Sequence, residues 1–213
     1  RYILILCNAI GSPIDSKTIT IEPLFIHMTP FHIIIANHEN VFIWQYSSII
    51  SHNKGTNNNN NNNNSYNKTN KTRLFHIDDL TANYNNTNDI DMNHHATADM
   101  ICAITASTTS LMIARASGSI FYYHLPSIQL KNQYILENIR AKHIALNCTS
   151  TRLSIIDIGG YLHLYDLIEE NGKLLNFKRK DVCDMLWSND EAEMFATIEK
   201  VRMYVYRGIS PEE

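Results

Sequence analysis

The chain has 213 residues, of which 44% are hydrophobic and 18% charged, and its formal net charge is −3. This length predicts one domain or slightly more, with enough apolar residues for a packed core. The weakly acidic balance argues against a nucleic-acid partner, and the lack of an apolar run of about 20 residues argues against direct membrane insertion.

The first 22 residues contain two short stretches in which apolar and polar residues alternate, "YILILCN" at 2–8 and "TITIE" at 18–22. Such period-two patterns predict strands. We interpret residues 1–22 as outer strands of a blade that precedes the others. A secretory signal pattern is not seen at this end, and we expect the sequence to be a fragment of a longer, cytosolic chain.

A strand–turn–strand unit follows at 31–45, "FHIIIANHENVFIWQ", with a further strand on each side, at 23–28 and 73–79. We assign this blade to residues 23–80. It is interrupted at about 51–70 by an Asn-rich tract, which cannot bury apolar surface and is expected to be a disordered insertion. The third strand is expected to end near Tyr46 and the fourth to start near Arg73.

A polar linker is expected at 81–99, and the same unit then recurs about every 40 residues, at 110–124, 152–166 and 193–207. Flanking strands are predicted at 100–106, 133–138, 143–148, 173–179 and 182–187. Four short strands per repeat of this length are typical of a propeller blade. We therefore assign blades to 100–140 and 141–180 and an incomplete blade, without its outer strand, to 181–213.

The fold predicted is all-β: a partial WD40-type β-propeller of about three to four four-stranded blades. Each repeat closes its third strand on an aromatic residue: Trp44, Tyr123, Tyr165 and Tyr206. Because these aromatics hold equivalent places in every blade, we interpret them as structural packing residues. A stacking platform for single-stranded nucleic acid fits that regularity less well.

The repeats depart from the usual WD pattern. Tyr165-Asp166 keeps the acid after the aromatic, but the preceding turn has Gly159, and the other blades end in Trp-Gln, Tyr-His and Tyr-Arg. We therefore expect the usual Asp-His-Ser-Trp hydrogen-bond network to be mostly absent and the blades to rest on aromatic and aliphatic packing.

The cysteines indicate no redox or metal chemistry. No Cys-x-x-Cys pair occurs, and most of the four lie within apolar runs, which predicts reduced, buried, structural thiols: Cys7, Cys102, Cys148 and Cys183.

Other candidate chemistry is weak. Divalent-metal ligand types gather at Asp89, Asp91, His94 and His95, but in a polar linker that cannot fix their geometry. The carboxylates of "HIDD" (76–79) end an edge strand, where charge commonly prevents edge pairing. "GG" (159–160) lacks the context of a phosphate loop, and "KRKD" (178–181) suits a solvated rim. No catalytic residue, metal ligand or cofactor is assigned.

Several stretches resemble the WD repeat-containing protein 35 family, the two-propeller subunits of intraflagellar transport complex A. They are residues 3–29, 101–107, 146–162, 179–190 and 199–213. The resemblance implies most of a second propeller in a non-enzymatic scaffold for retrograde ciliary transport and for entry of membrane proteins into cilia. It also implies other intraflagellar transport A subunits and ciliary membrane-protein cargo adaptors as partners, located at the cilium and ciliary base with a cytoplasmic pool.

Two alternatives stay open at this point. One is a WD-repeat adaptor of another kind, such as a vesicle-coat protein or a ubiquitin-ligase substrate receptor. The other is a ligand-binding or enzymatic propeller, which predicts several charged residues converging on the innermost strands. Those strands show little charge beyond Asp184.

Overall fold

The computed structural model describes residues 1–49, 66–79, 99–168 and 171–211, and these residues form strands without any helix. The strands make five antiparallel sheets, each built from consecutive segments of the chain. No helix of this described part is long and apolar enough to cross a membrane. The predicted all-β class is confirmed.

A two-stranded sheet begins the chain, formed by β1 (Tyr2–Cys7) and β2 (Pro13–Ile19). The first four-stranded sheet contains β3 (Phe25–Met28), β4 (His32–Ala36), β5 (Asn40–Ile49) and β6 (Tyr66–His76). The second contains β7 (Ile101–Ala106), β8 (Ser110–Arg115), β9 (Ser119–His124) and β10 (Gln129–Ile135).

The third four-stranded sheet contains β11 (Ala141–Leu146), β12 (Arg152–Asp157), β13 (Leu162–Asp166) and β14 (Lys173–Arg179). The fourth contains β15 (Val182–Trp187), β16 (Met194–Glu199), β17 (Arg202–Arg207) and β18 (Ser210–Pro211). Its outer strand β18 has only two residues and pairs with Tyr206 and Arg207.

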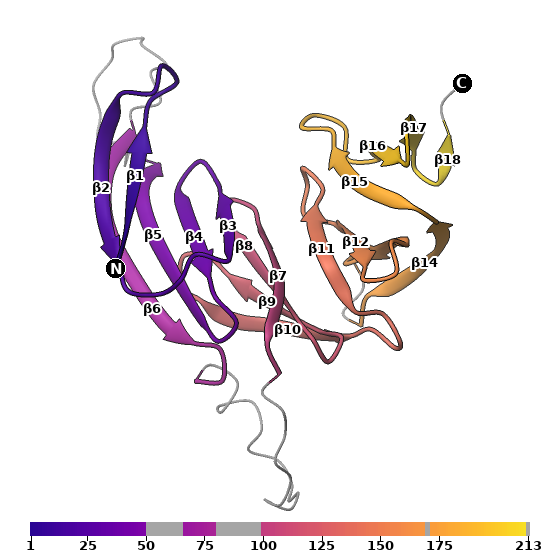
Figure 1. The fold of residues 1–213 in the computed structure, drawn as a ribbon, viewed down its shortest axis with the longest axis horizontal. Helices are drawn as coiled ribbons and strands as arrows, with labels where there is room; N and C mark the ends of the chain where they lie inside the picture. The colour runs from indigo at the N-terminus through magenta and orange to yellow at the C-terminus, as the bar shows by residue number, and fades with distance from the viewer. Residues whose placement is uncertain (50–65, 80–98, 169–170, 212–213) are drawn as a thin grey trace, which may run out of the picture.

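The sheets follow one another around an arc (Figure 1). The first strands of the four larger sheets, β3, β7, β11 and β15, line the inside of the arc, and β6, β10 and β14 lie toward its rim. Antiparallel neighbours joined by short turns make each sheet a meander, which is the arrangement of a propeller blade. The structure is thus the partial propeller that the sequence predicts.

The cores lie between successive sheets. One buried cluster joins the β3–β6 sheet to the β7–β10 sheet through residues such as Ile34 and Ile113. Others join β7–β10 to β11–β14, and β11–β14 to β15–β18. A further cluster packs Leu4 and Leu6 of β1 around buried Trp44. Stability therefore comes from face-to-face stacking of blades, since period-two strands offer an apolar side to each neighbour.

The expected end of the third strand and the expected start of the fourth strand, on either side of the Asn-rich insertion, are both wrong. β6 begins at Tyr66, seven residues before the predicted start at Arg73, and β5 continues to Ile49 rather than ending near Tyr46. The register pairs Ser47 with Lys68 and Ile49 with Tyr66. Backbone hydrogen bonds can lengthen a hairpin without apolar side chains, so a polar composition concealed these strand residues.

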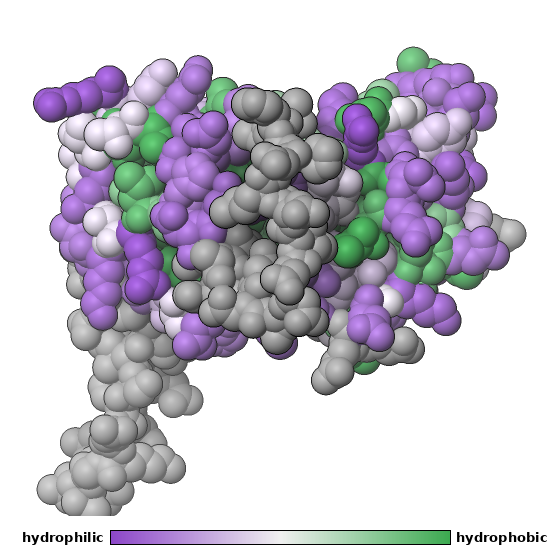
Figure 2. Space-filling model, turned by 90° about the horizontal axis from the view of Figure 1, so that it is seen from below, coloured by the Kyte–Doolittle hydropathy of each residue, from purple (hydrophilic) through white to green (hydrophobic). Residues whose placement is uncertain are grey.

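Viewed from below, the described surface is mainly hydrophilic, with smaller apolar patches (Figure 2). Two long apolar side chains are exposed on the last sheet, Leu186 by 75% and Met203 by 71%. These two lie on the face of that sheet opposite to Phe195 and Tyr206, which pack against the preceding blade.

Candidate interaction surface

The aromatics predicted at the end of each third strand all lie in the blade cores. Trp44 and Tyr123 are fully buried, Tyr206 is 2% exposed and Tyr165 is 7% exposed. Burial of the ring raises the pKa of Tyr123 to about 12, and burial does the same for Tyr206. None of these rings is available to stack on a ligand from solvent.

Three of these aromatics contact an aromatic on the outer strand of the preceding blade. The ring centroids are 6.3 Å apart for Tyr123 and Phe75, and 5.5 Å apart for Tyr165 and Tyr134. Tyr206 lies 5.5 Å from its partner Phe177. Such tilted and edge-to-face pairs contribute about 0.5–1.5 kcal/mol each beyond their buried area. These pairs were not predicted from the sequence, although all three partners lie within the predicted outer strands.

The last junction also contains a polar network centred on Glu199. Arg179 of the preceding blade donates to both carboxylate oxygens, from Nε at 3.0 Å and from Nη2 at 2.7 Å. The hydroxyls of Thr197 and Tyr206 each donate to Oε1 at 3.2 Å. The hydrogen bonds from Arg179 are the main reason that the pKa of Glu199 lies below its usual value.

Two further polar contacts belong to the third blade. His163 Nε2 lies 3.0 Å from Asp157 Oδ2, while Asp157 Oδ1 accepts the backbone N–H groups of Gly159 and Tyr161. Burial by itself would raise the pKa of Asp157, but these hydrogen bonds lower it. At the last junction, between the third and fourth blades, Trp187 Nε1 donates to Ser154 Oγ at 3.1 Å.

The four-residue Asp-His-Ser-Trp network does not form among the described residues of the last two blades, but separate pairs of these residue types do. Asp157 pairs with His163, and Ser154 pairs with Trp187 across two blades, with no residue shared between the pairs. In the last blade an arginine–glutamate–tyrosine set lies at the junction. Pattern matching at fixed offsets does not detect such replacements, because the partners meet through tertiary packing.

The prediction of buried cysteines is also wrong. All four thiols are free, three are exposed and only Cys102 is partly buried. Cys7 lies on the side of β1 opposite to Leu4 and Leu6, and Cys183 follows buried Val182. An apolar run does not make every residue in it buried, since alternate side chains of a strand point to opposite faces.

The remaining weak candidates have structural places. The residues Asp89, Asp91, His94 and His95 lie outside the described residues. Among the described residues, no group of three or more His, Cys, Asp or Glu side chains could hold a metal ion. Asp78 of "HIDD" forms an ion pair with Arg115 at 2.9 Å. In "KRKD", Lys178 lies over the Tyr161 ring at 4.1 Å, and Asp181 pairs with Lys200 at 3.0 Å.

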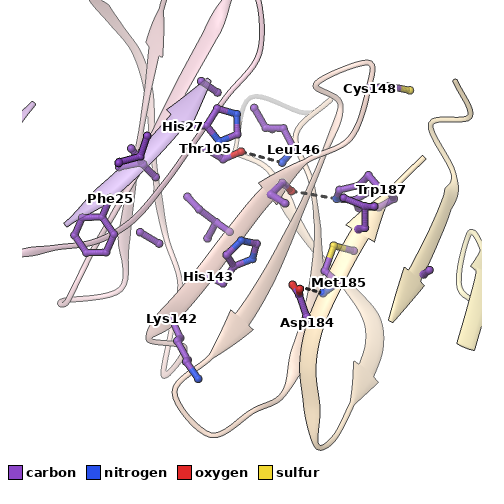
Figure 3. A pocket seen from close by; sticks show the side chains of 18 of the residues that line it. Phe25, His27, Thr105, Lys142, His143, Leu146, Cys148, Asp184, Met185 and Trp187 are labelled. Atoms are coloured by element: carbon purple, nitrogen blue, oxygen red, sulfur yellow. Dashed lines mark hydrogen bonds between the residues drawn. The ribbon is translucent and has the colours of Figure 1, made fainter. Parts of the chain in front are cut away.

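A groove of about 790 Å³ lies along the innermost strands. Its walls are largely apolar and come mainly from β3, β7, β11 and β15, with Phe25 and Met185 on opposite sides (Figure 3). Figure 3 shows His27 and His143 inside it and Lys142 at one end. Asp184 is the one carboxylate among the described lining residues.

The groove holds more basic groups than its strands indicated in the sequence. Burial lowers the pKa of His27, and nearby His143 lowers it further, against a hydrogen bond with the backbone of Ala106 that raises it. The groove therefore has apolar walls with a few polar groups among them, His27, Lys142, His143 and Asp184.

The family model described as "WDR35 second beta-propeller" matches residues 1–213. The chain is 40% identical over 223 residues to WD repeat-containing protein 35 of Rattus norvegicus, which covers all of this chain and 19% of the relative. It is 41% identical over 222 residues to the Homo sapiens protein, covering all of this chain and 18% of that one. The chain thus spans about a fifth of the length of these relatives.

The structure is similar to solved propellers at low sequence identity. Kluyveromyces lactis Hsv2 is matched with a TM-score of 0.59 and 13% identity, over 98% of this chain and 56% of that chain. A chain of the mitotic checkpoint complex is matched with a TM-score of 0.54 and 13% identity, over 89% of this chain and 49% of that chain. At this identity the likeness supports the fold alone.

Proposed function

The chain belongs to the family of WD repeat-containing protein 35, and from this membership we propose that it is a non-enzymatic scaffold within the intraflagellar transport A complex. In this role the propeller makes protein–protein contacts that serve retrograde ciliary transport and the entry of membrane proteins into cilia. Its partners are other subunits of that complex and cargo adaptors, at the cilium and ciliary base with a cytoplasmic pool.

The observation that supports this proposal is the full-length match to the second propeller of the family at about 40% identity. The structure adds a physical basis for a scaffold. Blades are joined through buried aromatic pairs and ion pairs, such as Arg152 with Glu193 and Arg179 with Glu199, so each is held firmly against the next. A firmly stacked arc presents turns, rim and groove in constant positions, as docking of partners requires.

The test compares proteins recovered with the tagged full-length protein and with a version lacking residues 1–213, in ciliated cells. We expect the deletion to lose at least one intraflagellar transport A subunit and to reduce retrograde movement. The matched control removes only the eight consecutive asparagines at 57–64, which lie between β5 and β6, and it leaves eight residues to connect the paired ends Ile49 and Tyr66. Because the described strands stay intact in that control, it is expected to retain every subunit.

Recovery of the complete set of subunits by the version lacking residues 1–213 would contradict a scaffold role for this region. Loss of subunits by the control would show that shortening of the β5–β6 connection, rather than removal of the propeller surface, governs assembly.

A further inference from the structure

Two neighbouring turns present exposed aliphatic side chains at equivalent places. Ile158 is 71% exposed in the turn between β12 and β13, and Val201 is 94% exposed in the turn between β16 and β17. Exposed lysines and arginines come from the same turns and from the segments beside them. The name turn surface is used for Arg140, Lys142, Ile158, Lys178, Lys180, Lys200, Val201 and Arg202.

Backbone hydrogen bonds hold these segments together. The Ile158 N–H donates to the Arg140 carbonyl at 3.0 Å, and the Val182 N–H donates to the Gly160 carbonyl at 3.0 Å. The Lys200 N–H donates to the Asp181 carbonyl at 3.2 Å. The turn surface is thus one continuous region spanning the last two blades.

This region contains six basic side chains and the carboxylate of Asp181 among them, whereas the formal net charge of the chain is −3. Among the described residues, Lys200 is the one basic member with an ion pair, to Asp181, and Lys178 rests on the Tyr161 ring. Within the described residues, no ion pair joins Arg140, Lys142, Lys180 or Arg202 to a carboxylate. Uncompensated cations around aliphatic side chains complement a partner that is acidic and apolar together.

The groove indicates a protein rather than a lipid surface as this partner. Lys142 belongs to the turn surface and also lines the groove, where His143 follows it (Figure 3). Basic groups therefore continue from the exposed turns into a concavity with apolar walls. An extended chain can follow that path, whereas a flat bilayer can contact only the exposed turns.

We propose that the turn surface binds an acidic protein segment whose aliphatic side chains contact Ile158 and Val201, and which continues past Lys142 into the groove. The inference rests on the proposed scaffold function, since it names the chemistry of one partner. Charge attraction of this kind acts over about 10 Å at 0.1 M salt and weakens as salt increases.

The test uses full-length protein and two labelled twelve-residue peptides, one of alternating Glu and Leu and one of alternating Gln and Leu. We expect fluorescence anisotropy to show binding of the Glu peptide, weakened at least tenfold in 0.5 M salt, and little binding of the Gln peptide. The variant K180E/R202E should weaken Glu-peptide binding about tenfold or more, because it replaces two attractions by repulsions. The matched control is K71E/K173E, which changes charge equally at exposed lysines outside the turn surface.

A second pair of variants tests the aliphatic contact. I158S/V201S should weaken binding about fivefold or more, whereas I135S/I168S should not, although Ile135 and Ile168 are 70% and 74% exposed. Equal effects of test and control variants, or equal binding of the two peptides, would overturn the proposal. Binding to phosphatidylserine vesicles, with no binding of the Glu peptide, would overturn it in favour of a membrane contact.

Recovery of intraflagellar transport A subunits by K180E/R202E separates this inference from the proposed function. If the variant binds the Glu peptide normally while assembly fails on deletion of residues 1–213, the scaffold role stands without this surface. If K180E/R202E loses the peptide and keeps the subunits, the surface serves a further partner, such as cargo.

Discussion

Replacing Gly172 by alanine is expected to destabilise the junction between the second and third four-stranded sheets. Gly172 lies in the turn between β13 and β14 with a φ of 61°. A Cβ at this position would lie 2.3 Å from Cε1 of Tyr165 and 2.9 Å from the Tyr134 ring. These two rings form the aromatic pair of this junction, so the added methyl group would push directly against it.

The expected cost has two parts. A left-handed backbone costs an L-residue about 1–2 kcal/mol, and overpacking of a dense core costs about 1–3 kcal/mol. The free energy of unfolding should therefore fall by about 2–5 kcal/mol. Gly208 is a matched control, since it lies in the corresponding turn of the last blade with a φ of 65°, and its Cβ would meet only Glu193 Oε2, at 3.8 Å. G208A should show the backbone part alone, about 1–2 kcal/mol.

Hydrogen–deuterium exchange of the full-length protein measures this difference locally. The two variants should differ by about 1–3 kcal/mol at their own junctions, which corresponds to roughly 5- to 150-fold in the exchange of protected amides. Relative to the unsubstituted protein, G172A should accelerate exchange in peptides covering β10 and β13 more than G208A accelerates exchange in peptides covering β16 and β17. Equal acceleration in both variants would refute the contribution assigned to the aromatic contact.

Three other predictions concern the junctions and the thiols. Y206F should lower the free energy of unfolding by about 1 kcal/mol in denaturant titrations, because its hydroxyl donates to Glu199; Y123F should be neutral or stabilising, since the Tyr123 hydroxyl is buried without a hydrogen-bond partner among the described residues. Because the pKa of Glu199 is lowered in the folded protein, its ionised form adds to the free energy of unfolding above the ordinary value of 4.5, and this contribution is lost as pH falls below it. E199Q should therefore show less acid destabilisation of the last blade. An unchanged pH midpoint of acid unfolding in E199Q would contradict this. Maleimide at pH 7.5 should leave Cys102 unmodified, because burial raises its pKa to about 11, and should modify the exposed thiols Cys7, Cys148 and Cys183.

The strands and their grouping into sheets could be predicted because they depend on local patterns. Strands such as β12 and β13 alternate apolar and polar residues over most of their length, whereas β4 and β8 are short, mostly apolar runs. The recurrence of Tyr123, Tyr165 and Tyr206 about every 40 residues, with Trp44 one repeat and the Asn-rich insertion before them, marks the blades. The match to the family's second propeller agrees with the resemblance seen in the residues. Strand ends were predicted less well where polar backbone pairing lengthens a hairpin, as at the start of β6.

The candidate surface could be predicted only in part. "KRKD" was identified as a basic rim segment, and two of its residues, Lys178 and Lys180, belong to the turn surface. Ile158 and Val201 carried no signal in the sequence, because a single aliphatic residue in a turn is indistinguishable from a core residue until its exposure is known. Their proximity follows from blade stacking, which places corresponding turns of successive repeats side by side.

The sequence by itself determined the all-β class, the repeat and the family, since these follow from period-two alternation and from stretches of consecutive residues. Tertiary structure alone decided which partners meet across blades. It pairs Phe75, Tyr134 and Phe177 with the next blade's aromatic, and it joins Arg179 to Glu199. It also turned Cys7 and Cys183 outward. The physical reason is that alternation assigns side chains to two faces of a sheet, whereas only stacking decides which neighbour, if any, covers each face.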